Sequence, residues 1–155
     1  MMTLLLATLL VGQTPGPVAV EVLPFDPAAL RAMAPVEIQV DEGGKGVKYS
    51  GVPLATLLKP KDRAEVPMAG LRALSDAVLL VRAADGYQVA VSATAVAMDP
   101  KGERYLLALA RDGKPLDPGS GPVRLIVPGD AKHARWVKSV AAVRLVRLDK
   151  LVTEP

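Results

Sequence analysis

The stretch that decides the fold is Gly121–Leu148, GPVRLIVPGDAKHARWVKSVAAVRLVRL. It contains an apolar run from Val123 to Val127, a break at Pro128-Gly129, a basic loop, and a second apolar run from Val137 to Leu148. Two short apolar runs separated by a Pro-Gly pair predict two strands joined by a turn. We therefore expect this stretch to form a two-strand unit.

The loop between the two runs is the candidate ligand-binding site. It carries the only His and the only Trp of the chain, His133 and Trp136, among the cations Lys132, Arg135 and Lys138. Clustered ammonium and guanidinium donors suit a small anion, and Arg can contact a phosphate or carboxylate through two parallel hydrogen bonds. The alternative is a solvated basic loop. For Trp136 we expect a buried ring whose N–H donates to a carbonyl, and for His133 a surface or turn position.

Composition limits the function classes. A chain of 155 residues with 50% hydrophobic residues is long enough for one folded domain with one core. Aromatic residues make up only 3% and the net charge is only +3, whereas nucleic-acid binders combine concentrated charge with stacking aromatics. We therefore expect no nucleic-acid partner. The absence of cysteine removes thiol catalysis, thiolate metal ligands and disulfides, and no Gly-x-Ser-x-Gly turn presents a nucleophile.

The N-terminal residues 1–12, MMTLLLATLLVG, are uncharged and apolar and end at the Gln13–Pro17 break. The run is too short to span a bilayer but has the length of the apolar region of a signal peptide. We expect a signal peptide over residues 1–16, a single domain over 17–150 and a loose tail over 151–155. The protein would then be periplasmic or secreted, with no stable membrane span. The alternative for residues 1–12 is an N-terminal strand.

The rest of the chain reads as many short strands with a few short helices between them. Asp26 and Ser92 are expected to cap two of the helices. Strands are expected at 18–23, 36–40, 46–49, 76–83, 87–91 and 105–110, and short helices at 27–33, 53–58, 68–74 and 93–97, with Met68, Leu71 and Leu74 facing inward. This order predicts an α+β fold with a mixed, mainly β sheet and short helices.

Three arginines stand out in apolar strands. Arg124 interrupts the run from Val123 to Val127, so it either lies on the solvated face of the sheet or points inward to a carboxylate such as Asp130 or Asp85. Arg144 and Arg147 are expected to protect an exposed strand edge.

Five motifs, in this order and at this spacing, resemble the oxidoreductase molybdopterin-binding domain of the sulfite oxidase superfamily, particularly its small, exported, stand-alone members. They are YSGVPLATLL at 49–58, ADGY at 84–87, RDGKPL at 111–116, GPVRLIVPG at 121–129 and RWVKSV at 135–140. The resemblance spans roughly Val36 to Val146. It implies an α+β fold with a mixed sheet, which agrees with the interpretation of the strands and helices.

The resemblance also implies molybdopterin as a cofactor, but this chain departs from the family pattern. In catalytic members a cysteine thiolate binds molybdenum, and this sequence contains no cysteine. A Ser-Val-Lys-Trp segment of the family, which helps to hold the pterin, matches here only at Arg135-Trp136, with no preceding Ser and a shorter loop.

We therefore expect no cofactor and a non-catalytic, exported binding or accessory module. Its partner would be a small anionic ligand or a periplasmic protein. Two alternatives stay open: a pterin-dependent oxidoreductase subunit that holds its metal without cysteine, and a purely structural domain.

Overall fold

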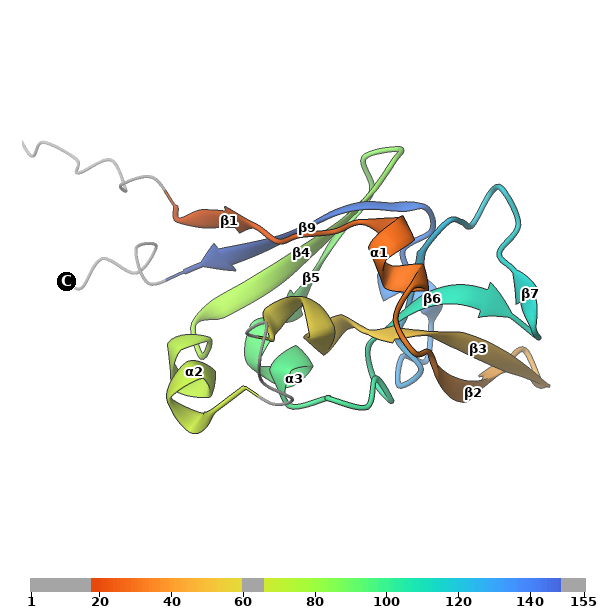
Figure 1. The fold of residues 1–155 in the computed structure, drawn as a ribbon, viewed down its shortest axis with the longest axis horizontal. Helices are drawn as coiled ribbons and strands as arrows, with labels where there is room; N and C mark the ends of the chain where they lie inside the picture. Colours follow the sequence, from red (N-terminus) through yellow and green to blue (C-terminus); the bar gives the residue numbers. More distant parts are fainter. Residues whose placement is uncertain (1–17, 60–65, 149–155) are drawn as a thin grey trace, which may run out of the picture.

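The computed structural model describes residues 18–59 and 66–148. Their strands form two sheets that pack against each other (Figure 1). The first has the order β1 (Val20–Val22), β9 (Val140–Arg147), β4 (Ala77–Ala83), β5 (Gln88–Ser92). The second has the order β2 (Val36–Glu42), β3 (Lys45–Pro53), β6 (Leu106–Arg111), β7 (Lys114–Pro115), and β8 (Arg124–Ile126) pairs with β6 beside β7.

The expected α+β class with short helices is confirmed, while the strand directions differ from a mixed sheet. Every strand pair in the described part of the chain is antiparallel. For three of these pairs the reason is local, because β2–β3, β4–β5 and β6–β7 are hairpins, and a hairpin can only join antiparallel strands. The β2–β3 and β6–β7 turns contain the pairs Gly43-Gly44 and Asp112-Gly113, which have positive φ at both positions. Two-residue hairpin turns require this conformation.

The Gly121–Leu148 stretch does form two strands, but β8 and β9 belong to different sheets. β8 pairs with β6, whereas β9 lies between β1 and β4. Two backbone bonds still tie the stretch together, from Leu125 N–H to the Val137 carbonyl at 2.8 Å and from Val140 N–H to the Val123 carbonyl at 2.9 Å. The stretch therefore links the two sheets instead of forming one hairpin.

The short helices lie close to their predicted positions: α1 (Pro27–Arg31), the 3₁₀ helix η1 (Leu54–Leu58), α2 (Met68–Ala73) and α3 (Ala93–Ala97). Both predicted caps are confirmed, because Asp26 accepts from the Ala28 N–H and Ser92 from the Ala95 N–H. The inward orientation predicted for Met68 is wrong, since its side chain is 66% exposed. Leu71 of α2 and its C-cap residue Leu74 turn toward the core. None of the helices in residues 18–59 and 66–148 is long and apolar enough to cross a membrane.

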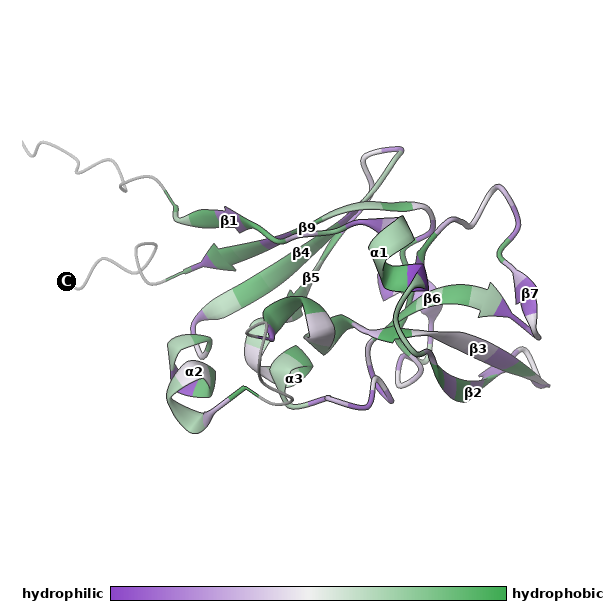
Figure 2. Cartoon of the chain, viewed as in Figure 1, coloured by the Kyte–Doolittle hydropathy of each residue, from purple (hydrophilic) through white to green (hydrophobic). Residues whose placement is uncertain are grey.

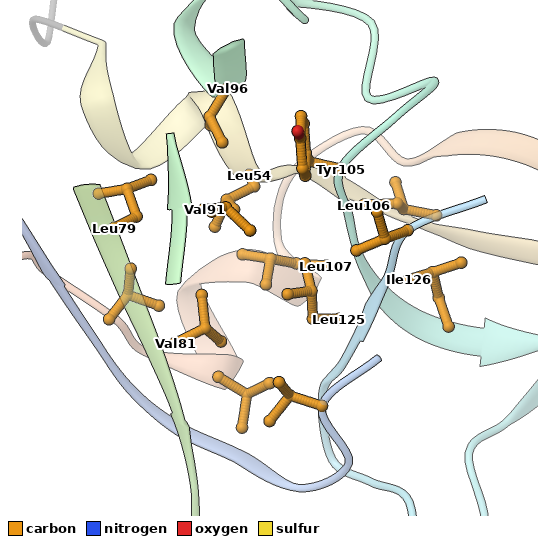
Figure 3. Close-up of a cluster of buried hydrophobic side chains, with 14 of the residues drawn as sticks. Leu54, Leu79, Val81, Val91, Val96, Tyr105, Leu106, Leu107, Leu125 and Ile126 are labelled. Atoms are coloured by element: carbon orange, nitrogen blue, oxygen red, sulfur yellow. The ribbon is translucent and has the colours of Figure 1, made fainter. Parts of the chain in front are cut away.

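The core lies between the two sheets (Figure 3). Leu79 and Val81 of β4 face Leu107 of β6 and Leu125 of β8, and all four side chains are fully buried. The core is almost entirely aliphatic, as expected from the low aromatic content. β4 is fully buried on one face only, because Val78 and Leu80 on the other face are half-buried. In Figure 2 β4 is largely hydrophobic in colour, whereas the short β7 at the other end is hydrophilic.

The edge-protecting role predicted for Arg144 and Arg147 is wrong, because β9 is flanked on both sides by strands. Arg147 instead donates a hydrogen bond to the carbonyl of Ala73 at the end of α2. β9 pairs with β1 and β4, which both lie far from it in the sequence, so its central position was not visible in the local pattern.

Candidate functional site

The predicted binding loop contains a short 3₁₀ helix, η2 (His133–Arg135), followed by Trp136. Trp136 is only 5% exposed, and its Nε1–H donates to the carbonyl of Val127 at 2.7 Å. The His133 ring stacks on the Trp136 ring, with centroids 3.6 Å apart and planes 11° from parallel. The structural role expected of Trp136 is confirmed, and His133 lies on the surface as predicted.

Arg135 is paired within the same loop. Its Nε donates to Asp130 Oδ2 at 2.9 Å and its Nη2 donates to Asp130 Oδ1, which is the two-bond fork typical of an Arg–carboxylate pair. The hydrogen bonds to Asp130 raise the pKa of Arg135, against the opposing effect of burial. Asp130 neutralises the positive charge of Arg135, so this pair stabilises the loop and does not offer a free cation to a ligand.

The remaining loop cations, Lys132 and Lys138, are exposed. A second loop touches this one: the Tyr87 hydroxyl, at the tip of the β4–β5 hairpin, donates to the carbonyl of Ala134. The five predicted residues are thus neighbours in one loop, where His133, Lys132 and Lys138 face solvent while Arg135 and Trp136 hold the loop in place. Ligand binding by this loop stays a prediction.

A second cluster of polar groups surrounds Arg124 on β8, and we call it the Arg124 cluster: Arg124, Tyr49, Trp136, Glu42 and Arg111. Arg124 Nη1 donates to the Tyr49 hydroxyl at 3.1 Å, and that hydroxyl donates to Glu42 Oε1 at 2.6 Å. The other oxygen of Glu42 accepts from Arg111 Nη2 at 2.7 Å. The Arg124 guanidinium also lies 5.3 Å from the Trp136 ring centroid, within cation–π range.

Neither partner predicted for Arg124 is correct. It is partly buried, but its contact is the hydroxyl of Tyr49, 75 residues away, and not the carboxylate of Asp130 or Asp85. The pKa of Tyr49 is raised to about 12, mainly by burial of the hydroxyl and to a lesser extent by its hydrogen bond to Glu42. The hydroxyl therefore stays neutral at ordinary pH and leaves the positive charge of Arg124 uncompensated. Arg124 Nε is buried and has no hydrogen-bond partner among the described residues.

Arg124 lines a cleft of about 430 Å³ together with Arg111, Lys114, Asp112 and Asp117. Both acids of the cleft are occupied: Asp112 accepts from the Lys48 N–H at 2.9 Å, and Asp117 accepts from the Gly119 N–H at 2.9 Å. Hydrogen bonds, first from the Ser120 side chain, hold the pKa of Asp117 below its usual range.

Two cations of the cleft are left without an acidic partner. Among the described residues, Lys114 and Arg124 lie within ion-pair distance of no carboxylate. The cleft lining therefore carries three cations, Arg111, Lys114 and Arg124, against the carboxylates of Asp112 and Asp117, which leaves an excess of positive charge for an incoming ligand. The only sequence signal for it was the charged Arg124 in an apolar strand, because the residues that complete the cleft come from the separate β6–β7 hairpin.

The described residues contain no group of three or more His, Cys, Asp or Glu that could hold a metal ion. The chain also supplies no thiolate, since it has no cysteine. Chemically, the site is a cleft with an excess of cationic side chains, one of which, Arg124, lies against the ring of Trp136.

Comparison with known proteins agrees with this fold and with the motif order. The family model of the oxidoreductase molybdopterin-binding domain matches residues 29–151. Among curated proteins none matches this chain significantly. The matched region covers both sheets from α1 onward, the Arg124 cluster and the predicted loop. This chain therefore belongs to the oxidoreductase molybdopterin-binding domain family.

Proposed function

We propose that this domain is an exported, non-catalytic binding module that holds a small molecule with a phosphate-like anionic group in the cleft at Arg124. The observation that carries the proposal is the uncompensated guanidinium of Arg124, which has a buried, unpartnered Nε and lines the cleft. A buried charge without a counterion is costly, so a native site that retains one is suited to an anionic ligand. Export rests on the apolar residues 1–12, which lie outside the described residues.

The family ligand, molybdopterin, fits this chain in part. Its phosphate is the kind of group that Arg124 and Lys114 would hold, and the Trp136 ring supports Arg124 from behind. Its metal does not fit, because molybdenum in catalytic members takes a soft sulfur donor from the protein and this sequence has none. This mismatch favours binding without molybdenum catalysis.

Inorganic phosphate and sulfate are direct probes of the cleft. A ligand that binds only the native state raises its stability by about 2.7 kcal/mol at a hundredfold excess over Kd. We expect phosphate to raise the Tm of the wild type, and we expect Lys114→Gln to reduce that rise. Lys101→Gln is the matched control, because Lys101 is also exposed but does not line the cleft.

The same measurement separates the cleft from the predicted loop. If the loop were the binding site, Lys132→Gln combined with Lys138→Gln would abolish the phosphate effect and Lys114→Gln would not. A wild type whose Tm does not respond to high phosphate or sulfate would argue for the purely structural alternative and against any anion site.

The second candidate function is a pterin-dependent oxidoreductase subunit that holds its metal without cysteine, and the family match over residues 29–151 favours it. Protein purified from its native host separates the two proposals. Stoichiometric molybdenum and pterin, with reduction of the bound centre by an electron donor, would support the enzyme. Pterin or another phosphate-bearing molecule recovered without molybdenum would support the binding module.

A further inference from the structure

A second groove lies at the opposite end of the molecule, between β1, η1, α2 and the end of β9 (Figure 1). It has a volume of about 520 Å³, within the range of small-molecule sites. Leu23, Leu74 and Leu145 lie at its base and are each less than 10% exposed, and Leu57 and Leu58 line it as half-buried side chains. The groove shares no lining residue with the cleft at Arg124.

A smaller depression lined by Ala19 and Val20 adjoins the groove at the β1–β9 pair, and the two share Glu21, Leu145 and Arg147. An extended apolar body with a polar end suits this shape better than a compact ring does.

Arg147 lies where the groove and the depression meet. Its Nη1 donates to the Ala73 carbonyl, which fixes the guanidinium at this position. Among the described residues no carboxylate is within ion-pair distance of Arg147. Among the described residues that line the groove, Lys59 is a second cation and Glu21 is the one acid, so the polar end of the groove favours a negative group.

We propose that this groove binds a single acyl chain that ends in an anionic group, with the chain over Leu23, Leu58 and Leu145 and the anion at Arg147. This site is separate from the proposed anion cleft, and binding at either one does not depend on the other.

The test uses decanoate as the probe, titrated into the full-length protein by isothermal titration calorimetry. We expect one decanoate per chain and weaker binding of decyltrimethylammonium, which has the same chain and the opposite charge. Ala73→Leu places a larger side chain in the groove from an exposed helical position, and should weaken decanoate binding at least tenfold. Arg147→Gln should weaken decanoate roughly tenfold to a hundredfold and remove the preference over the cationic probe.

Matched controls lie outside the groove. Ala29→Leu adds the same side chain at an exposed position of α1, and Arg72→Gln removes an exposed arginine of α2, and both should bind decanoate like the wild type. Circular dichroism confirms folding, and Ala73→Leu keeps the test valid if Arg147→Gln does not fold. Absence of decanoate binding, or wild-type affinity in Ala73→Leu, would overturn the proposal.

A vesicle arm separates the two sources of such a ligand. Sedimentation with phosphatidylglycerol vesicles that Ala73→Leu abolishes would identify a bilayer lipid as the source of the chain. Decanoate binding without sedimentation would identify a free amphiphile.

Discussion

Arg124 lies in a strand of buried aliphatic residues and makes no direct ion pair with a carboxylate of the described residues. Its contacts are a hydroxyl and an aromatic ring. The Tyr49 hydroxyl accepts a hydrogen bond from Arg124 and donates one to Glu42, so the hydroxyl lies between the guanidinium and the negative charge of Glu42. The ring of Trp136 lies against the guanidinium, while Trp136 itself is fixed by its bond to Val127. The neutral hydroxyl and the ring hold the Arg124 side chain in position and leave its positive charge available to a ligand.

At the residue scale we predict a loss of stability in alkaline solution that depends on Tyr49. The pKa of a free tyrosine is about 10, and that of folded Tyr49 is about 12. Between these values the unfolded chain has lost the proton and the native protein keeps it, so the free energy of unfolding falls as the pH rises. The contribution is fully present below pH 10, is lost on passing through pH 12, and is on the order of 2 kcal/mol.

Urea denaturation of the wild type and of Tyr49→Phe from pH 9 to pH 12 measures this effect. The wild type should lose stability more steeply than the variant. Tyr87→Phe is the control, since the Tyr87 side chain is 49% exposed. Parallel curves for the wild type and Tyr49→Phe would contradict the prediction.

At the scale of elements, the close pairing of β3 and β6 depends on Gly51. The register shifts between Ser50 and Gly51, and a Cβ at Gly51 would lie 2.1 Å from the Leu107 carbonyl oxygen. Backbone atoms of a central strand cannot move away as a flexible side chain can. A glycine at such a position marks a close backbone approach.

We therefore predict that Gly51→Ala destabilises the protein by roughly 3 kcal/mol or more, because it forces the β3 and β6 backbones apart. Gly46→Ala is the matched control in the same strand: its Cβ would meet the end of the Gln39 side chain, which can rotate away. Thermal unfolding should show a large drop in Tm for Gly51→Ala and a small change for Gly46→Ala. Equal Tm values for the two variants would refute the argument.

At the scale of the whole molecule, stability comes from the contact between the two sheets. Leu125 of β8 is fully buried among residues of both sheets, as Figure 3 shows. Truncating such a side chain removes its burial and leaves a cavity. Because the Leu125 N–H donates to the carbonyl of Val137, the same position also fixes the segment next to Trp136.

We predict that Leu125→Ala lowers the free energy of unfolding by about 2 to 5 kcal/mol. Val22→Ala, in the exposed edge strand β1 and 69% exposed, should change it by less than about 0.5 kcal/mol. Chemical denaturation of both variants checks this. A small effect of Leu125→Ala would mean that the two sheets do not share one core.

Export is a prediction about the whole molecule as well. If residues 1–16 are a signal peptide, the protein isolated from its native host should lack them and should be found outside the cytoplasm. Intact-mass spectrometry of the purified protein and of cell fractions tests this. A mature protein that keeps Met1 in the cytoplasmic fraction would contradict it.

The sequence by itself determined the α+β class, the helix caps at Asp26 and Ser92 and the aliphatic core, and the order of its motifs pointed to the family. These features depend on residues a few positions apart, where turn geometry, capping and periodicity act. Only the tertiary structure decided that β8 and β9 lie in different sheets, that Arg124 meets Tyr49, and that Arg147 borders a groove. Those outcomes depend on contacts across tens of residues, where many partners are compatible with the local pattern and packing selects among them.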